Sequence, residues 1–225
     1  MLEVVKEEKW PNGKKKSWAK NIDGKLTILV TYDETGRFIE KHEYKYHGNG
    51  KIRIDKKFDI YANCLCETEY DNSGNFVKRT SSKCNAAYQV IEQSYYSEDD
   101  TLLCSVQYEY HSNGAVSLKR KVSSSGQALE ITEYDEDGNL TSKKEWYEGG
   151  KPKSEETYDK FGHITSKIEW YEDGKPKSEE TYDKYGHITS KKEWSKAGIQ
   201  ILEETYDEAG DLTSKKEWYE DGKPK

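Results

Sequence analysis

The chain has 225 residues, which is enough for one domain or a short repeat array and too few for several catalytic modules. Leu, Ile, Val and Phe make up only 36 of these residues, which excludes a thick aliphatic core, whereas 28 aromatic residues argue against disorder. The net charge of −7 comes without a concentrated basic stripe, so a nucleic acid is not expected as the partner.

Turn-like positions recur along residues 1–126 at uneven intervals close to a dozen until Gly114 is reached. Most of these early positions are glycine, but three are not, and all three lie between residues 51 and 113. The early positions are Gly13, Gly24, Gly36, Gly50, Ala62, Gly74, Tyr88 and Asp100. We therefore interpret residues 1–126 as irregular N-terminal repeats and residues 127–225 as a regular continuation of one array.

From Gly114 to Gly222 a glycine recurs at every twelfth position, and an aromatic ring lies four positions before most of these glycines. From residue 134 onward Tyr alternates with Trp, so the full period is a pair of such units, one hairpin repeat. Because side chains alternate along a strand, we expect the rings to line one face of a sheet. This repeat aromatic face comprises Tyr134, Trp146, Tyr158, Trp170, Tyr182, Trp194, Tyr206 and Trp218, and Tyr110 continues the row upstream.

Each 12-residue unit is too short for a helix and its connections, and its Thr, Tyr, Trp and Ile content with two-residue alternation predicts a strand. Asp-x-x-Gly connectors such as Asp135–Gly138 are typical of a type I turn closed by a left-handed glycine. Connectors this short join antiparallel neighbours. The sequence therefore predicts an all-β fold: an elongated antiparallel meander of about 18 short strands in a single-layer or partly curled sheet.

Residues 145–155 and 170–179 resemble the bacterial variant of the MORN repeat. The interleaved residues 158–164 and 206–212 are similar to the YD repeats of Rhs-type toxin shells. The resemblance implies hairpin-forming β repeats, used in MORN-type arrays for protein or membrane contacts, and bacterial relatives are often antitoxin-like. Neither family supplies a catalytic residue, and a closed toxin-like shell needs far more repeats than this chain has.

The four cysteines, Cys64, Cys66, Cys84 and Cys104, are all in the irregular part of the chain. Only the first two are close in sequence, which does not match a zinc site, and hairpin pairing places them opposite residues 79–81 rather than opposite Cys84. We therefore expect free thiols, with no metal and no cofactor. No grouping of Ser, Cys and His and no phosphate-binding loop is visible, so we predict no catalytic residue and no enzyme activity.

Departures from a regular repeat are where selectivity can be encoded. Residues 52–110 replace turn glycines and concentrate aromatic and basic residues, so we expect partner recognition there. The candidate binding residues are Phe58, Tyr61, Tyr88, Tyr95, Tyr96, Lys56, Lys57 and Arg79.

These patterns favour a non-enzymatic protein-binding repeat module, in its sharper form an inhibitor or immunity-type protein that docks on an effector. Two alternatives stay open: a structural cell-surface or envelope array, and nucleic-acid binding by the N-terminal half. No apolar run is long enough to cross a bilayer. Reduced thiols favour the cytoplasm, and a removed leader would favour the periplasm or the cell surface.

Overall fold

The computed structural model describes residues 2–61 and 63–225, and for residue 64 the backbone only. These residues form 18 strands joined in one antiparallel sheet, which confirms the predicted all-β fold. They form no helix, so none could span a membrane. The strands are β1 (Glu3–Lys9), β2 (Lys15–Ile22), β3 (Lys25–Tyr32), β4 (Phe38–Tyr46), β5 (Ile52–Phe58), β6 (Cys64–Tyr70), β7 (Phe76–Cys84), β8 (Val90–Tyr96), β9 (Leu102–Tyr110), β10 (Val116–Ser123), β11 (Ala128–Tyr134), β12 (Leu140–Trp146), β13 (Pro152–Tyr158), β14 (Ile164–Trp170), β15 (Pro176–Tyr182), β16 (Ile188–Trp194), β17 (Gln200–Tyr206) and β18 (Leu212–Glu217).

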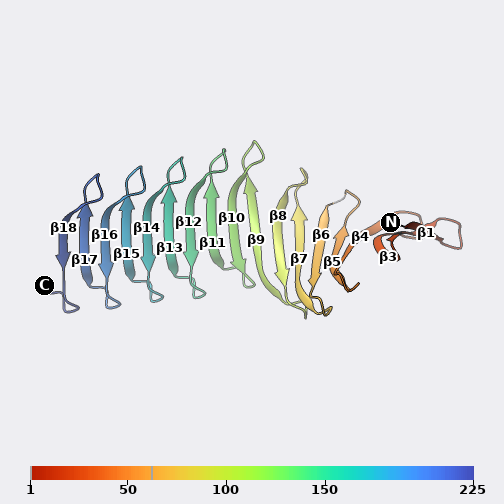
Figure 1. Ribbon diagram of the computed structural model, residues 1–225, viewed down its shortest axis with the longest axis horizontal. Helices are drawn as coiled ribbons and strands as arrows, with labels where there is room; N and C mark the ends of the chain where they lie inside the picture. The colour runs from red at the N-terminus through yellow and green to blue at the C-terminus, as the bar shows by residue number, and fades with distance from the viewer. Residues whose placement is uncertain (1, 62) are drawn as a thin grey trace. The chain divides into compact units, whose positions relative to one another are not determined.

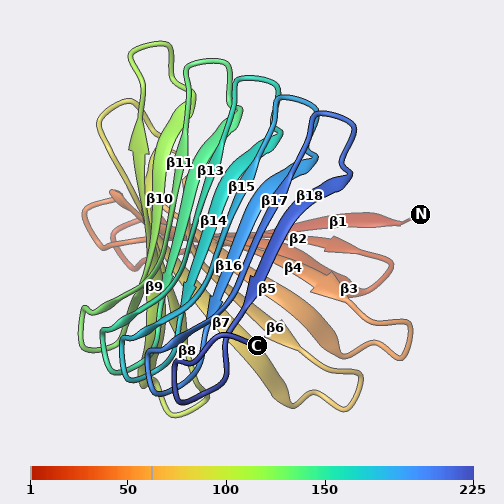
Figure 2. The same ribbon diagram turned by 90° about the vertical axis from the view of Figure 1, so that its left-hand side faces the viewer.

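The chain divides into two compact units, unit 1 at residues 1–105 and unit 2 at residues 106–225, with the boundary inside β9. Within each unit, successive strands pair as hairpins, as in the β12–β13 and β13–β14 pairs. Figure 1 shows β10 to β18 lying side by side in chain order, and Figure 2 shows their turns alternating between the two edges of the sheet. Every second turn of unit 2 therefore lies on the same edge.

The turn at Asp159 illustrates how the sequence closes each hairpin. The N–H of Gly162 donates to the carbonyl oxygen of Asp159 at 3.0 Å, and Gly162 adopts a φ of +83°. A carboxylate oxygen of Asp159 also accepts the N–H groups of Phe161 at 2.8 Å and His163 at 3.0 Å. The predicted combination of an Asp-stabilised turn and a left-handed glycine is thus confirmed at this connector.

The strand register explains why the sequence repeats over pairs of strands rather than over single strands. In unit 2, Glu145 lies opposite Ser154 and Thr157 lies opposite Ser142, so cross-strand partners away from the turns have residue numbers of opposite parity. Partners share a face, and neighbours along a strand alternate. Equivalent residues of successive strands, such as Glu145 and Thr157, therefore lie on opposite faces, and only equivalent residues of every second strand share one.

This register corrects the prediction that Tyr and Trp line a single face. In unit 2 the tyrosines that end the strands lie on one face, here called the Tyr face, and the tryptophans lie on the other, the Trp face. The Tyr face carries Tyr134, Tyr158, Tyr182 and Tyr206, and the Trp face carries Trp146, Trp170 and Trp194, with Trp218 following β18 in the same alternation. The expectation failed because it assumed that equivalent positions in successive units face the same way.

The sheet has almost no enclosed interior. Among the described residues, the only apolar residues that are buried are Ile54, Val106 and Val122, and each of them keeps 6–9% of its surface exposed. Turns on the same edge are instead tied together through side chains: the hydroxyl of Tyr147 donates to the carbonyl oxygen of Trp170, and that of Tyr171 to the carbonyl oxygen of Trp194, both at 2.8 Å. Each unit is therefore a single layer of strands without a second layer packed against it among the described residues.

Candidate functional site

A groove of unit 1 runs across β5 to β8 and has a volume of about 560 Å³. The register places alternate residues of these strands on the grooved face, with Lys56 opposite Glu67, Glu67 opposite Thr80 and Thr80 opposite Tyr95. The lining comprises Lys56, Asn63, Glu67, Lys78, Thr80, Ser82, Cys84, Tyr88, Val90, Gln93 and Tyr95. Three of the eight predicted binding residues, Lys56, Tyr88 and Tyr95, therefore lie together in it.

Two exposed tyrosines stand at one end of this groove. Tyr61 follows β5 and Tyr88 precedes β8, so both belong to turns on the same edge of the sheet. Their ring centroids are 5.8 Å apart, and the residues are 68% and 58% exposed. The sequence thus predicted both rings, and the structure brings them into contact with each other.

Tyr88 has an unfavourable backbone conformation. It occupies the turn position that is glycine at fourteen other described turns, and it has a φ of +63°. Among residues 2–61 and 63–225, the other non-glycine residues with positive φ are Asp23 and Asp100, and aspartate tolerates this region better than a bulky residue does. Backbone strain that a protein retains is found preferentially at functional sites.

The charged residues of the groove are paired across strands. The ammonium group of Lys56 lies 2.5 Å from a carboxylate oxygen of Glu67, and that of Lys78 lies 3.1 Å from Glu69. Hydroxyl groups of Thr80, Ser82 and Tyr95 and the amide of Gln93 provide neutral hydrogen-bonding groups in the remaining lining. The groove therefore offers hydrogen bonds and aromatic surface rather than a single strong charge.

Three of the other predicted binding residues lie on the opposite face of unit 1. Lys57, Arg79 and Tyr96 have register positions that alternate with those of the groove. The guanidinium group of Arg79 stacks over the ring of Tyr96 at 4.9 Å and forms an ion pair with Asp100. The prediction treated these residues as one cluster, but adjacent residues of a strand point to opposite faces.

Phe58 shares the grooved face by register, opposite the backbone of Cys64. The ammonium group of Lys41 lies 5.0 Å from the centre of its ring. Phe58 does not line the groove, so it lies on the same face as the candidate site but is not part of it.

A polar cluster around His42 was not anticipated from the sequence. Nδ1 of His42 lies 2.8 Å from a carboxylate oxygen of Asp55, Nε2 lies 3.6 Å from Glu40, and the imidazole stacks on Tyr44 at 5.8 Å. Burial raises the pKa of the Tyr44 hydroxyl. The signal that could have revealed the cluster is the hairpin register, which places His42 and Asp55 diagonally across β4 and β5.

Cys66 lies on the same face as His42, with Lys57 between them in the register. Burial raises the pKa of the Cys66 thiol, which opposes thiolate formation and therefore nucleophilic reactivity. Cys66 lies opposite Ser81, as the sequence predicted, and Cys66, Cys84 and Cys104 are thiols rather than disulfides. The side chain of Cys64 lies outside the described residues, and no group of His, Cys, Asp and Glu among the described residues could hold a metal ion.

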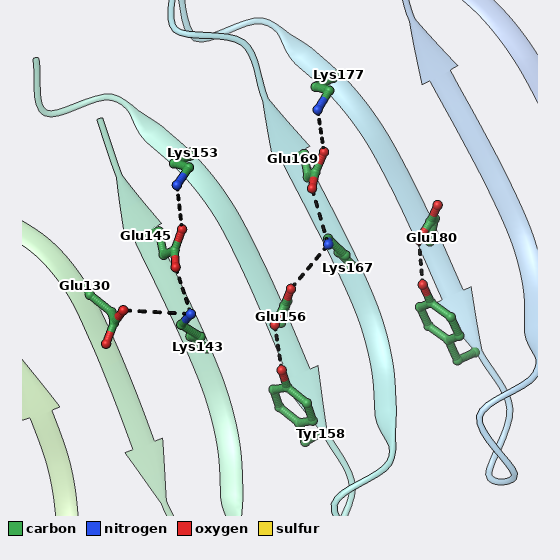
Figure 3. Close-up of polar contacts among 11 residues, drawn as sticks. Glu130, Lys143, Glu145, Lys153, Glu156, Tyr158, Lys167, Glu169, Lys177 and Glu180 are labelled. Carbon is green, nitrogen blue, oxygen red and sulfur yellow. Dashed lines mark hydrogen bonds and ion pairs between the residues drawn. The ribbon is translucent and has the colours of Figure 1, made fainter. Parts of the chain in front are cut away.

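The Tyr face of unit 2 carries a repeated ionic network (Figure 3). The ammonium group of Lys143 lies 2.7 Å from Glu145, whose other carboxylate oxygen lies 2.9 Å from Lys153. Hydrogen bonds from Lys143 and then Lys153 lower the pKa of Glu145 to about 2. The same arrangement recurs two strands later, where Glu169 lies 3.3 Å from Lys167 and 2.8 Å from Lys177.

Tyrosine hydroxyls extend this network toward the opposite edge. Tyr158 donates a hydrogen bond to Glu156 at 2.5 Å, and Tyr182 donates one to Glu180 at 2.5 Å. Burial, together with the Glu156 carboxylate, raises the pKa of Tyr158 to about 12. Because almost every charge in these rows has a neighbour of opposite sign, we assign the network to the stability of the sheet rather than to ligand binding.

Comparison with known proteins supports a repeat family. Residues 143–160 and 167–184, less than half of the chain, match the family described as MORN repeat variant. None of the curated proteins is similar enough in sequence to count as a relative.

The solved structures that this chain matches include toxin-complex components. A crystal structure of TcdB2–TccC3–Cdc42 matches 96% of this chain and 14% of its own, with 12% identity and a TM-score of 0.23. The Tc holotoxin pore of Photorhabdus luminescens matches 95% of this chain and 14% of its own, with 12% identity and a TM-score of 0.25. A porin-like protein from Bacteroides uniformis matches 95% of this chain and 92% of its own, with 11% identity and a TM-score of 0.30. The chain thus spans about 14% of the toxin chains it matches.

Proposed function

We propose that this repeat protein is a non-enzymatic protein-binding module and that the groove of unit 1 is its docking site. The observation that carries the proposal is Tyr88, an exposed ring held in a left-handed backbone conformation beside the groove. In its sharper form, the module is an inhibitor or immunity-type protein that covers the working surface of an effector.

The hydrogen bonds of the turn do not require a tyrosine at position 88, so they do not explain why the strained residue is kept. The N–H of Tyr88 donates to the carbonyl oxygen of Asn85 at 3.0 Å, and the side chain of Asn85 accepts the N–H groups of Ala87 and Gln89. All three bonds need only backbone groups from residues 87–89, so glycine at position 88 would form the same turn. A residue with a side chain lowers the stability by about 1–2 kcal/mol when its backbone is left-handed. The ring of Tyr88 is exposed, so its burial offsets little of this loss. A ligand contact accounts for keeping the ring.

The chemistry of the groove favours a protein partner. Tyrosine rings are among the side chains that contribute most to protein–protein affinity, because they bury a large area and still offer a hydroxyl group. Tyr88 and Tyr95 line the groove together with neutral hydrogen-bonding groups, Tyr61 contacts the ring of Tyr88, and the groove lysines are held in ion pairs. A nucleic-acid site would instead present unpaired cations along a backbone-length path.

The experiment is an affinity capture from the source lysate with the full chain as bait. We expect a stoichiometric protein to be retained by the wild type and lost from the double variant Tyr61→Ser/Tyr88→Gly, which removes two exposed rings. Tyr219→Ser is the matched control, because it removes a comparably exposed ring of unit 2. Equal retention by the groove variant and the control, or no stoichiometric partner at all, contradicts the proposal.

The inhibitor form is tested on the retained protein. After purification, its activity is titrated with the wild-type chain and with the groove variant. Inhibition that saturates at a one-to-one ratio and disappears with Tyr61→Ser/Tyr88→Gly supports the sharper proposal. Full activity in a saturated complex removes the inhibitor role and leaves a scaffold role.

A further inference from the structure

Two neighbouring turns of unit 2 depart together from the repeat. The turns that begin at Asp135, Asp159, Asp183 and Asp207 lie on the same edge, because a turn on the other edge separates each from the next. In the two middle turns the three variable positions are Lys, an aromatic residue and His. In the two outer turns the same positions carry acidic, amide or small residues: Glu136, Asp137 and Asn139 in the first turn, and Glu208, Ala209 and Asp211 in the last.

The aromatic rings of the middle turns are among the most exposed in the molecule. Phe161 is 72% exposed and Tyr185 is 67% exposed. Each follows a lysine whose ammonium group lies over the ring, at 5.1 Å for Lys160 and 4.9 Å for Lys184. Position i+2 of this turn accepts almost any residue, so the turn does not require an aromatic ring there.

The exposed cations of these turns are the ammonium groups of Lys160 and Lys184. The carboxylates of Asp159 and Asp183 are bonded into the turns and are only 21% and 18% exposed. The side chains of His163 and His187 are about half exposed, and Nδ1 of each lies 3.3 Å and 3.4 Å, respectively, from the carboxylate of its own turn, whereas the lysines lie over the rings at the tips. The outer turns present acidic side chains on both sides, which makes these two turns an isolated cationic and aromatic patch on the acidic unit 2.

We propose that this patch, formed by residues 159–163 and 183–187, is a second protein-docking surface and that it recognises an acidic segment of a partner protein. The two tips are two strands apart, about 9.6 Å. The matching segment therefore carries two acidic side chains at about that separation, with an apolar or aromatic side chain that packs on the exposed rings. The acidic outer turns repel a longer anionic surface and so restrict the segment to these two turns.

This inference rests on the proposed function only in assigning a protein as the partner. The groove of unit 1 is tested by variants at positions 61 and 88, whereas the patch is tested by variants and spectral changes in unit 2. Either site can therefore fail while the other stands.

The test uses the full ¹⁵N-labelled chain titrated with a decapeptide of alternating Glu and Tyr, with a decapeptide of alternating Ser and Tyr as the uncharged comparison. We expect chemical-shift changes at residues 159–163 and 183–187 with the Glu peptide, much smaller changes with the Ser peptide, and weakening by added salt. Changes spread over the whole sheet, or equal binding of the two peptides, overturn the proposal, as does no binding of the Glu peptide.

Lysine-to-glutamine variants then test whether binding of the Glu peptide depends on the lysines of the patch or only on the net charge of the protein. In Lys160→Gln/Lys184→Gln the loss of two exposed cation contacts should weaken the Glu peptide by about 5- to 30-fold. The matched control Lys196→Gln/Lys223→Gln removes two turn lysines from the other edge of unit 2 and should bind as the wild type does. Equal losses in both double variants overturn the assignment, because the effect then reflects net charge alone. Self-association of the wild type that disappears in Lys160→Gln/Lys184→Gln also overturns it, because the occupant is then a second copy.

Discussion

The strain at Tyr88 gives a quantitative test of the reasoning behind the docking site. Tyr88→Gly and Tyr88→Ala both remove the ring and its contact with Tyr61, but only glycine relieves the left-handed backbone. The relief is worth about 1–2 kcal/mol, and the greater freedom of glycine in the unfolded chain offsets about 0.5–1 kcal/mol of it. The glycine variant should therefore be more stable than the alanine variant by about 0.5–1 kcal/mol.

The measurement is urea unfolding of the two variants. With a denaturant dependence of about 1–3 kcal/mol per molar, the midpoint of Tyr88→Gly should lie about 0.2–1 M above that of Tyr88→Ala. Equal midpoints, or a higher midpoint for alanine, refute the claim that the backbone is strained at this position. Both variants should lose the partner, because both lack the ring.

Two glycine-to-alanine variants in unit 2 test the cost of the left-handed backbone in the opposite direction, because they introduce a side chain instead of removing one. Gly162 has a φ of +83° and open space where a side chain would point, whereas Gly149 has no positive φ and equally open space. Gly162→Ala should destabilise the chain by about 0.5–1 kcal/mol, and Gly149→Ala should be neutral or slightly stabilising. If the two alanine variants unfold alike, the left-handed turn position is not what sets the cost.

Further predictions concern the hydrogen bonds and ion pairs of unit 2. The side chain of Glu145 is mostly buried, and its pKa of about 2 lies below the value of an unfolded chain, so its stabilising contribution is present above about pH 4.5 and is lost as the pH falls toward 2. In Glu145→Gln the urea midpoint should therefore fall less between pH 5 and pH 3 than in the wild type. An equal fall in the two proteins contradicts this prediction. Tyr147→Phe and Tyr171→Phe each remove one hydrogen bond from a hydroxyl to a backbone carbonyl, and each should lower the free energy of unfolding by about 1 kcal/mol. We expect the two losses to add in the double variant. Strong non-additivity in thermal unfolding would show that the turns are coupled. Asp159→Ala should lower the urea midpoint clearly, whereas Asp159→Asn should lower it much less, because asparagine keeps a side-chain oxygen that accepts the N–H groups of Phe161 and His163. Equal losses in the two variants would show that the carboxylate charge matters instead.

The sequence was sufficient for the strands, the turns and part of the register. The interval pattern placed turn positions at Tyr88 and Asp100 although neither is glycine, and both have positive φ. The position of Cys66 opposite Ser81 also followed from hairpin pairing. These features are local, because each depends on a strand, a short connector and the strand that follows it.

The faces could not be assigned from the repeat pattern alone. Each hairpin shifts its register by one residue near the turn, as between Glu145 and Trp146, and that shift decides which residue lies opposite which. The cluster of His42 and Asp55 was missed because it depends on this pairing between β4 and β5. The separation of Lys56, which lines the groove, from Lys57, which pairs with Glu40 on the opposite face, follows instead from the alternation of side chains along β5.

The opposite orientation of equivalent residues in successive strands also limits how such an array can grow. Gain or loss of a single strand-and-turn segment would reverse the direction of every later strand and exchange its two sides, so that indole rings and the Glu145-type ion pairs would change places. Gain or loss of two consecutive segments would leave all later side chains where they were. Evolutionary or engineered changes in length should therefore be tolerated in pairs of strands, and single-strand insertions should be selected against.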